Sequence, residues 1–275
     1  MDKLEKAKPF LRWAGGKKWL TASLVEYAGN INYSSYIEPF LGGGSIFFSL
    51  SPQNAILSDC NEELINAYRC IQQYPYDVFD YLCSYENTSE FYYRIRSMKT
   101  EDKIERAARF IYLNQTSFNG LYRVNQKGEY NVPYGKRKKV SFDLENYLSV
   151  SSRLSNAELM NCDFEEAIDN VQFHSLVYLD PPYVVAKDDT GFIGYNQHLF
   201  SLDDQRRLSA CIDRIKEKDA FYILSNAKHP VILEIFNKGD TVLEVERASL
   251  IGGKKAYRGK TTEYIFTNLP SLVKK

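Results

Sequence analysis

The sequence Asp-Pro-Pro-Tyr at residues 180–183 constrains the fold most, because it ends the apolar run 176–179. A short apolar run before turn residues predicts a buried strand. Proline has no N–H and a fixed φ, so the strand cannot continue its ladder beyond this point. We expect a rigid strand end that presents the Asp180 carboxylate, the Pro181 carbonyl and the Tyr183 ring. Together these groups suit a planar ligand that bears an NH2, such as adenine.

A second strand-turn-helix pattern occupies residues 36–45, where an apolar strand runs into three glycines and then into the apolar stretch 46–48. This is the layout of a nucleotide-binding first loop. A dinucleotide fingerprint that starts at Gly42 puts Gly44 in its second slot. Its third slot then falls on Phe47, where a small residue is required, so a dinucleotide site is disfavoured.

The next predicted strand, residues 55–59, ends in the acid Asp59. In doubly wound folds a carboxylate at the end of the second strand accepts hydrogen bonds from ribose hydroxyls. A nucleoside without a pyrophosphate therefore fits both the glycine loop and this acid.

Strands and helices alternate through most of the chain, which predicts an α/β fold with a mostly parallel sheet. Strands are expected at 35–40, 55–59, 158–161, 175–180, 220–225, 241–246 and 262–267, and a helix at 203–216. The interval 75–151 is too long for a connection, and we expect an inserted helical subdomain there, with a helix at 105–111 and a turn or hairpin at 128–139. Residues 1–74 and 152–275 would then form the main domain.

Several acids lie at the predicted strand ends, where open α/β sheets bind their ligands. Chain order predicts that the segment Glu38 to Gly44, Asp59, Asp163 and Asp180 converge on one pocket. For single residues simpler interpretations stay open. Asp59 and Asp163 are also suited to cap helices, and Trp13 to fill the core.

The formal net charge is zero, with 35 basic and 35 acidic residues, but the basic residues are clustered. One cluster lies between 121 and 140 and the other between 251 and 260. Basic runs are most often solvated surface, yet two runs interleaved with Asn, Gly and aromatic residues favour contact with nucleic-acid phosphates. The first cluster contains Arg123, Lys127, Lys136, Arg137, Lys138 and Lys139 and one acid, Glu129. The second contains Lys254, Lys255, Arg258 and Lys260.

Metal and membrane sites are not expected. The five cysteines form no Cys-x-x-Cys pair, and the three histidines are far apart in sequence. No run approaches the roughly 18 apolar residues of a membrane span, and the first residues lack the apolar centre of a signal peptide. A cytoplasmic location is therefore expected.

From Pro9 to about Asn268 the chain resembles the Dam-type (alpha-group, D12 class) DNA adenine-N6 methyltransferases, in which the cofactor loop precedes the target-recognition segment and Asp-Pro-Pro-Tyr. The resemblance implies a Rossmann-like methyltransferase sheet with one antiparallel strand. It also implies the cofactor S-adenosylmethionine, which carries a ribose and an adenine without phosphates. The shared motifs are Pro-Phe-Leu-Arg-Trp-Ala-Gly-Gly-Lys at 9–17, Glu-Pro-Phe-Leu-Gly-Gly-Gly-Ser at 38–45, Asp59, Phe-Asn-Gly-Leu-Tyr-Arg-Val-Asn at 118–125, Asn-Val-Pro-Tyr-Gly at 131–135, Cys-Asp-Phe at 162–164 and Asp-Pro-Pro-Tyr at 180–183.

The resemblance also implies roles for individual residues. Phe118 would intercalate beside the flipped base, although some relatives have Tyr there, and Arg123 would read the guanine before the target adenine. Burial of Phe118 and Leu121 in the core of the insertion is the alternative. The implied cofactor site comprises Trp13, Lys17, Glu38, Pro39, Phe40, Gly42, Gly44, Asp59, Asp163, Phe164 and Asp180. The implied DNA site comprises Phe118, Asn119, Leu121, Arg123, Asn125, Pro133, Lys136, Arg137, Lys138 and Lys139.

The expected reaction is methyl transfer to the exocyclic amine of an adenine that has left the duplex. This amine is a poor nucleophile because its lone pair is delocalised. Asp180 and the Pro181 carbonyl would accept its two N–H bonds and stabilise the developing positive charge, while Tyr183 stacks on the ring. We expect double-stranded DNA as the partner and GATC as the site. The alternatives are GATATC, an amine or amide in RNA or protein, and a catalytically silent DNA-binding module.

Overall fold

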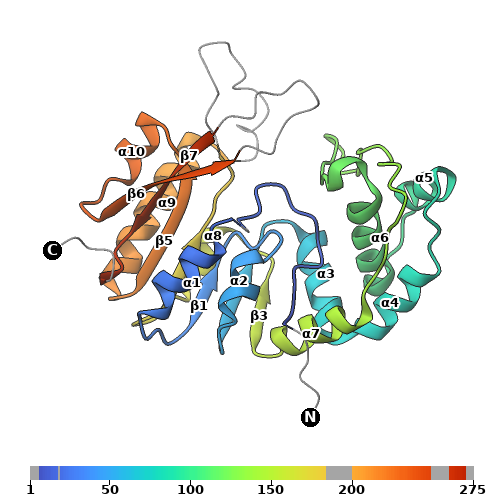
Figure 1. Ribbon diagram of the computed structural model, residues 1–275, viewed down its shortest axis with the longest axis horizontal. Coiled ribbons are helices and arrows are strands. Elements are labelled where there is room, and N and C mark those ends of the chain that lie inside the picture. Colours follow the sequence, from blue (N-terminus) through green and yellow to red (C-terminus); the bar gives the residue numbers. More distant parts are fainter. Residues whose placement is uncertain (1–5, 18, 184–199, 249–259, 271–275) are drawn as a thin grey trace. The chain divides into compact units, whose positions relative to one another are not determined.

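The computed structural model describes residues 6–17, 19–183, 200–248 and 260–270 (Figure 1). Its sheet has seven strands in the order β3-β2-β1-β4-β5-β7-β6. Strand β4 pairs in parallel with β1 and β5, whereas β7 runs antiparallel to both β5 and β6. The bounds are β1 Tyr36–Glu38, β2 Ala55–Ser58, β3 Ala157–Met160, β4 Leu176–Leu179, β5 Phe221–Ala227, β6 Thr241–Ala248 and β7 Lys260–Thr267. The predicted α/β fold, with one reversed strand, is confirmed.

Strand β4 shows why a continuous apolar run indicates a buried strand. All four of its residues are buried, and it lies between two parallel neighbours, with Leu176 opposite Phe221 and Leu179 opposite Leu224 on β5. A strand covered on both faces has no solvent side, so its sequence does not alternate between apolar and polar residues.

Several helices begin at polar caps, for instance Asn61 before α3, Asp102 before α6 and Ser201 before α9. The predicted helices at 105–111 and 203–216 lie within α6 and α9. The bounds are α1 Thr21–Gly29, α2 Ser45–Leu50, α3 Glu62–Gln73, α4 Pro75–Cys83, α5 Ser89–Ser97, α6 Lys103–Thr116, η1 Phe118–Gly120, α7 Leu144–Leu154, α8 Phe164–Asp169, α9 Leu202–Glu217 and α10 Pro230–Phe236. In the described part of the chain no helix has the length and apolarity to cross a membrane.

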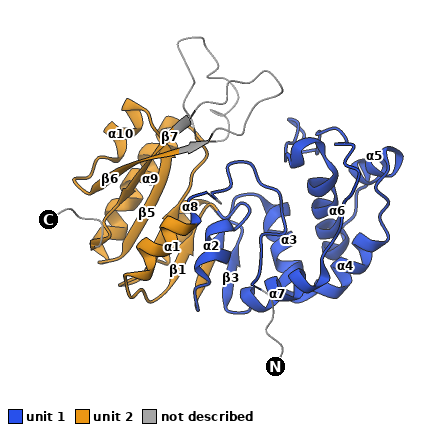
Figure 2. Cartoon of the chain, viewed as in Figure 1, with its two compact units in different colours: residues 1–21, 41–53, 57–162 blue, residues 22–40, 54–56, 163–275 orange. Residues whose placement is uncertain are grey.

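The chain divides into two compact units, shown in blue and orange in Figure 2. Unit 1 comprises residues 1–21, 41–53 and 57–162, and unit 2 comprises residues 22–40, 54–56 and 163–275. The inserted subdomain expected at 75–151 stays a prediction, as do the main-domain ranges 1–74 and 152–275.

In unit 1, helix α6 is the central element, because α3, α4 and α5 all pack against it. Its face is buried through small and apolar residues, including Ala107, Ala108 and Ile111, each fully buried. The end of α6 leads directly into the segment 117–135, so this buried helix is the support for the predicted DNA-reading loop.

In unit 2, the core lies between β4, β5, α9 and the strand β7. Leu179, Ile212, Leu224 and Phe266 belong to this core and are at most 1% exposed. The carboxyl end of β4, where residues 180–183 begin, therefore stands on a rigid base.

Candidate active site and DNA-reading loop

In unit 2, Asp180 is held from the neighbouring strand by Ser225. The Ser225 hydroxyl donates to Asp180 Oδ1 at 2.9 Å and lies 3.2 Å from the Tyr178 hydroxyl. Burial, with the Asp180 charge adding to it, raises the pKa of Tyr178 well above its usual range, so this phenol keeps its proton. Because the Ser225 hydrogen is used on Asp180, Tyr178 donates to Ser225. The result is a directed relay, Tyr178 to Ser225 to Asp180, that fixes one carboxylate oxygen.

Tyr183 is held in a similar way from the antiparallel strand β7. Its hydroxyl donates to Glu263 Oε2 at 2.7 Å, and Glu263 is 1% exposed. Burial and the charges of Asp180 and Glu263 raise the pKa of Tyr183 well above its usual range. Tyr183 is therefore a neutral donor whose ring orientation is fixed by a buried carboxylate.

The turn between these residues is braced from α9. Gln205 is fully buried; its amide nitrogen lies 3.4 Å from the Pro182 carbonyl oxygen, and its amide oxygen accepts from Asn226 at 3.0 Å. Sequence reasoning missed Ser225, Gln205 and Glu263, because each lies far from residues 180–183 in the chain and carries no motif of its own.

Asp163, also in unit 2, is the N-cap of α8, as the simpler interpretation expected. Its Oδ1 accepts from Glu165 N at 3.0 Å and from Arg207 at 2.9 Å. The Arg207 guanidinium also lies 4.8 Å from the centroid of the Phe164 ring, and Phe164 stacks on Phe40 at 5.5 Å. The cap leaves the Asp163 side chain half exposed, and its predicted cofactor contact stays a prediction.

Other predicted cofactor residues of unit 2 lie at the end of β1. Glu38 is 3% exposed, and its Oε2 accepts from the Tyr36 hydroxyl at 2.8 Å. Pro39 follows it and is buried. The phenol donor therefore fixes the position of this buried carboxylate.

In unit 1, the glycine loop lies against Trp13. Gly42 and Gly44 have positive φ values of 48° and 64°, which favours glycine at both. An added Cβ would lie 2.7 Å from Trp13 Cδ1 at Gly42, and 2.8 Å from the Tyr68 hydroxyl at Gly44. Trp13 is only partly buried, so it covers the loop and is not a core residue.

Asp59 holds the same loop from beyond β2. Its Oδ2 accepts from Gly42 N at 3.1 Å and its Oδ1 from Asn61 N at 3.0 Å. Burial raises the pKa of this carboxyl, and the two backbone hydrogen bonds oppose that shift. Asn61, not Asp59, caps α3, so the interpretation of Asp59 as a helix cap is wrong. Nearby, Lys17 is 4% exposed and its Nζ donates to the Gly15 carbonyl at 3.3 Å.

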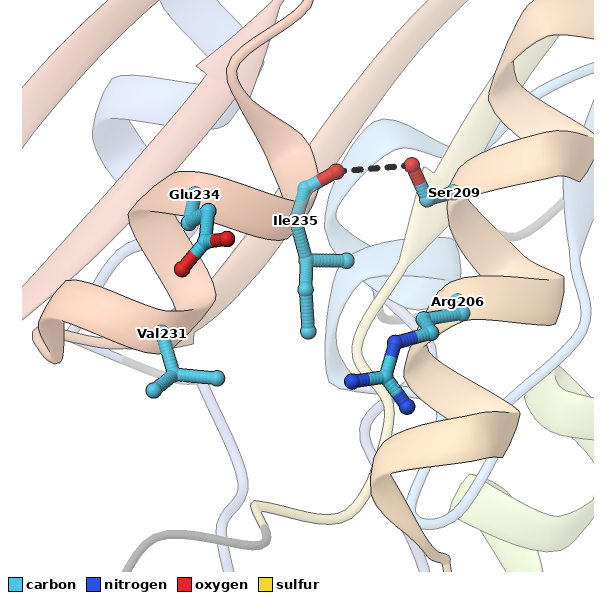
Figure 3. Close-up of a pocket in the computed structure, with 5 residues that line it drawn as sticks. All are labelled: Arg206, Ser209, Val231, Glu234 and Ile235. Atoms are coloured by element: carbon cyan, nitrogen blue, oxygen red, sulfur yellow. Dashed lines mark hydrogen bonds between the residues drawn. The ribbon is translucent and has the colours of Figure 1, made fainter.

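The predicted convergence of all these residues on one pocket involves both units and stays a prediction. A depression of about 270 Å³ in unit 2 lies between α9 and α10, and Figure 3 shows the Ser209 hydroxyl there, hydrogen-bonded to the Ile235 carbonyl at 2.8 Å. None of the predicted site residues lines it, and we assign it no role.

The DNA-reading loop predicted in unit 1 is exposed. Phe118 is 51% exposed and Leu121 39% exposed, so the alternative that both fill the core of the insertion is wrong. Asn119 is exposed and has a positive φ of 55°, which breaks the 3-10 turn between the two apolar residues. Large exposed apolar side chains on a rigid turn are suited to contact bases.

Arg123 is oriented from across a hairpin. Its Nε donates to Asn131 Oδ1 at 2.7 Å, and its Nη2 lies 3.5 Å from the Asn131 carbonyl oxygen. The side chain is exposed. The short contact fixes the plane of the guanidinium while committing only one of its nitrogens strongly.

The hairpin predicted around 128–139 begins earlier than expected. Bridges join Ser117 to Tyr134 and Val124 to Tyr130, so the paired segments are 117–124 and 130–134. Asn125 closes the turn through Oδ1, which accepts from the N–H groups of Lys127 and Glu129. This turn role is separate from its predicted DNA contact.

The basic run that follows is largely on the surface. Arg137 is tied back by Nη1 to the Gln115 carbonyl at 3.1 Å. Pro133 precedes the run and is exposed. Lys136, Arg137, Lys138 and Lys139 are all exposed. From the second basic run, Lys254, Lys255 and Arg258 lie outside the described residues.

Proteins of known class are similar to this chain over most of its length. Residues 13–251 match the D12 class N6 adenine-specific DNA methyltransferases. Type II methyltransferase M1.LlaDCHI of Lactococcus lactis subsp. cremoris is 38% identical, covering 98% of this chain and 99% of that protein. Type II methyltransferase M.MjaIII of Methanocaldococcus jannaschii is 38% identical, covering 80% of this chain and 84% of that protein.

A DNA adenine methylase of Haemophilus influenzae is 33% identical, with 84% of each chain covered. The matched region runs from Trp13 through the glycine loop, the hairpin and residues 180–183. The chain therefore belongs to the D12 class of N6 adenine-specific DNA methyltransferases.

Proposed function

We propose that this enzyme transfers the methyl group of S-adenosylmethionine to N6 of an adenine flipped out of double-stranded DNA, within the sequence GATC. The observation that carries the proposal is the braced strand end, where Asp180 is fixed by the Ser225 hydroxyl and Tyr183 by Glu263. Such bracing holds acceptors in place before the substrate arrives, which is the requirement for stabilising charge as it develops.

The fit of unit 1 to the cofactor rests on the glycine loop. Backbone at Gly42 and Gly44 approaches Trp13 and Tyr68 too closely for a side chain, and Asp59 already orders the loop through Gly42 N. We propose Trp13, Lys17, Gly42, Gly44 and Asp59 as cofactor contacts of this unit. S-adenosylmethionine, when bound, supplies a methyl group on a positively charged sulfur.

In unit 2 we propose further cofactor contacts from the strand ends, with Asp163 and Phe164 toward the adenine moiety. The aromatic contact between Phe40 and Phe164 supports a stacking environment there. The proposed unit 2 contacts are Glu38, Pro39, Phe40, Asp163, Phe164 and Asp180.

At the reacting centre, Asp180 and the Pro181 carbonyl accept the two N–H bonds of the adenine amine, and Tyr183 stacks on the base. The Ser225 bond holds Asp180 Oδ1, and we assign the other carboxylate oxygen, Oδ2, to the amine. Both phenols, Tyr178 and Tyr183, keep their protons, so neither adds a phenolate charge beside Asp180.

Target recognition is assigned to the exposed hairpin. We propose that Phe118 intercalates beside the flipped base, that Asn119, Leu121 and Pro133 contact neighbouring bases, and that Arg123 reads the preceding guanine. Asn125, Lys136, Arg137, Lys138 and Lys139 complete the proposed DNA surface. Family membership favours adenine in DNA over an amide or amine in RNA or protein, and GATATC is the alternative site.

The test compares matched variants in a methylation assay. Asp180→Ala should nearly abolish methyl transfer, and Ser225→Ala should lower kcat about tenfold through loss of one buried hydrogen bond. Ser209→Ala is the control, since it also removes one serine hydrogen bond, at the depression of Figure 3, and should leave kcat unchanged. Full turnover by Asp180→Ala would contradict the mechanism.

The sequence assignment is tested on otherwise identical duplexes that contain GATC, GATATC or CATG. The parent enzyme should methylate GATC, and Arg123→Ala should lose discrimination at the guanine, where a bidentate pair contributes about 1–3 kcal/mol. Equal methylation of CATG and GATC, or intact discrimination by Arg123→Ala, would show that Arg123 does not read this base.

A further inference from the structure

The end of helix α6 contains an amide that joins two functional segments of unit 1. Asn114 is fully buried. Its Oδ1 accepts from Arg12 N at 2.8 Å, and its Nδ2 donates to the Arg12 carbonyl at 2.7 Å and to the Gly120 carbonyl at 3.4 Å. One acceptor and both amide hydrogens are therefore used on backbone atoms of two separate segments.

The first segment is the N-terminal strip, residues 8–13, which ends in Trp13, the residue that covers the glycine loop. Arg12 is adjacent to Trp13, whose indole lies over Gly42 and stacks on Tyr122 with ring centroids 5.6 Å apart. Fixing the Arg12 backbone through both its N–H and its carbonyl therefore also fixes the position of Trp13.

The second segment is the exposed turn between Phe118 and Leu121. Gly120 has a positive φ of 65°, and an added Cβ there would lie 2.8 Å from Arg12 Cβ, so the two segments are in direct contact. The next carbonyl, that of Leu121, accepts from the Tyr130 hydroxyl at 2.6 Å. The turn is thus held by its backbone, which leaves Phe118 and Leu121 exposed without being loose.

We propose that Asn114 is a positioning residue for target recognition, which sets the turn 118–121 against the segment of Arg12 and Trp13. This inference rests on the proposed role of that turn in reading DNA. Asn114 itself does not contact the substrate, because it is buried beneath the turn. Its loss would let the turn sample several orientations, so that cognate and altered sites are read more equally.

The chain offers a matched control in helix α7. Asn146 makes the same pair of bonds to a backbone in the same N-terminal strip, accepting from Lys8 N at 2.9 Å and donating to the Lys8 carbonyl at 3.0 Å. Its side chain makes no bond to the turn 118–121 among the described hydrogen bonds. Asn146→Asp therefore tests tethering of the strip alone.

The experiment first identifies the site of the parent enzyme by sequencing methylated DNA from expressing cells, so the test does not depend on GATC. The ratio of kcat/KM for that site to kcat/KM for its single-base variants is then measured for each variant. Because the ratio comes from one preparation, partial unfolding does not change it.

Asn114→Asp keeps the acceptor for Arg12 N and removes both donations, so it should lower the ratio about tenfold, while Asn146→Asp should leave it unchanged. If Asn114→Asp does not fold, Gly120→Ala displaces the same contact from the turn side and should have the same effect. A lower total activity with an unchanged ratio would overturn the proposal, as would an equal loss by Asn146→Asp.

Phe118→Ala separates the two hypotheses. If it leaves discrimination and DNA affinity intact, the proposed role of the turn is wrong. If Phe118→Ala impairs recognition and the variants at Asn114 and Gly120 do not, only the positioning role is wrong.

Discussion

Gly135 is the position where an added methyl group should most strongly destabilise the docking of the hairpin. Its N–H donates to the Thr116 carbonyl at 2.8 Å. An added Cβ would overlap the Ser117 carbonyl oxygen and lie 2.7 Å from its carbon and 2.9 Å from the Thr116 oxygen. These are backbone atoms at the end of a buried helix, so they cannot rotate away as a side chain would.

Relief of the overlap requires the segment 130–135 to separate from the end of α6. That movement breaks the Gly135 bond and the neighbouring bond from Phe118 N to the Pro133 carbonyl, 2.9 Å, at about 1 kcal/mol each. Overpacking that is not relieved adds about 1–3 kcal/mol. Gly135→Ala should therefore destabilise docking of the hairpin by about 3–5 kcal/mol, so hydrogen exchange at the Phe118 amide should become at least roughly a hundredfold faster.

Gly128→Ala is the matched control in the same hairpin. Gly128 has a positive φ of 76°, but no atom lies within 4 Å of an added Cβ, so only the backbone strain of about 1–2 kcal/mol applies. Hydrogen exchange and urea denaturation of both variants and the parent give the comparison. An effect of Gly135→Ala no larger than that of Gly128→Ala would refute the argument from backbone overlap.

Three further predictions concern the active site, the DNA surface and pH. Tyr183→Phe should keep much of the methyl transfer because the ring remains. It removes the donor to buried Glu263 and should lower the free energy of unfolding by about 1.5–3 kcal/mol. Unchanged stability in denaturation would show that Glu263 is satisfied otherwise. Neutralising Lys136 to Lys139 should weaken binding to any duplex. It should also reduce the slope of log binding constant against log salt concentration by about one for each phosphate that these side chains neutralise. An unchanged slope would assign the run to solvated surface. Hydrogen bonds from Ser201 lower the pKa of Asp204. The stability that the Asp204 carboxylate contributes is therefore present above its pKa in the unfolded chain and is lost as pH falls through its pKa in the folded protein. The stabilities of the parent and Asp204→Asn should converge as pH falls below about 4, and a pH-independent gap would argue against this cap.

The elements that sequence alone predicted well are those whose signals are local. The seven strands were each predicted from local sequence, and all of them occur within a few residues of the expected bounds. The prolines at 181 and 182 ended β4 at the expected place, since proline cannot continue a ladder. The glycine loop could also be predicted from the sequence, because only glycine readily tolerates the observed φ at Gly42 and Gly44.

Local signals failed where two roles use the same residue type. Asp59 was suited to cap a helix, but the structure caps α3 with Asn61, because Asp59 is occupied with Gly42 N. Phe118 and Leu121 were equally suited to a core or to a surface. Their exposure depends on Asn114 and Tyr130 holding the turn by its carbonyls, which no apolar pattern encodes.

The sequence by itself determined the order of the strands along the chain, the turn chemistry at their ends and the membership of a methyltransferase family. Only the tertiary structure decided which side chains hold the reactive residues in place. Ser225 is 45 residues from Asp180, Glu263 is 80 residues from Tyr183, and Asn114 is 102 residues from Arg12. A hydrogen bond needs its atoms within about 3 Å, and for such distant pairs that proximity is set by sheet order and helix packing, which no local pattern of residues specifies.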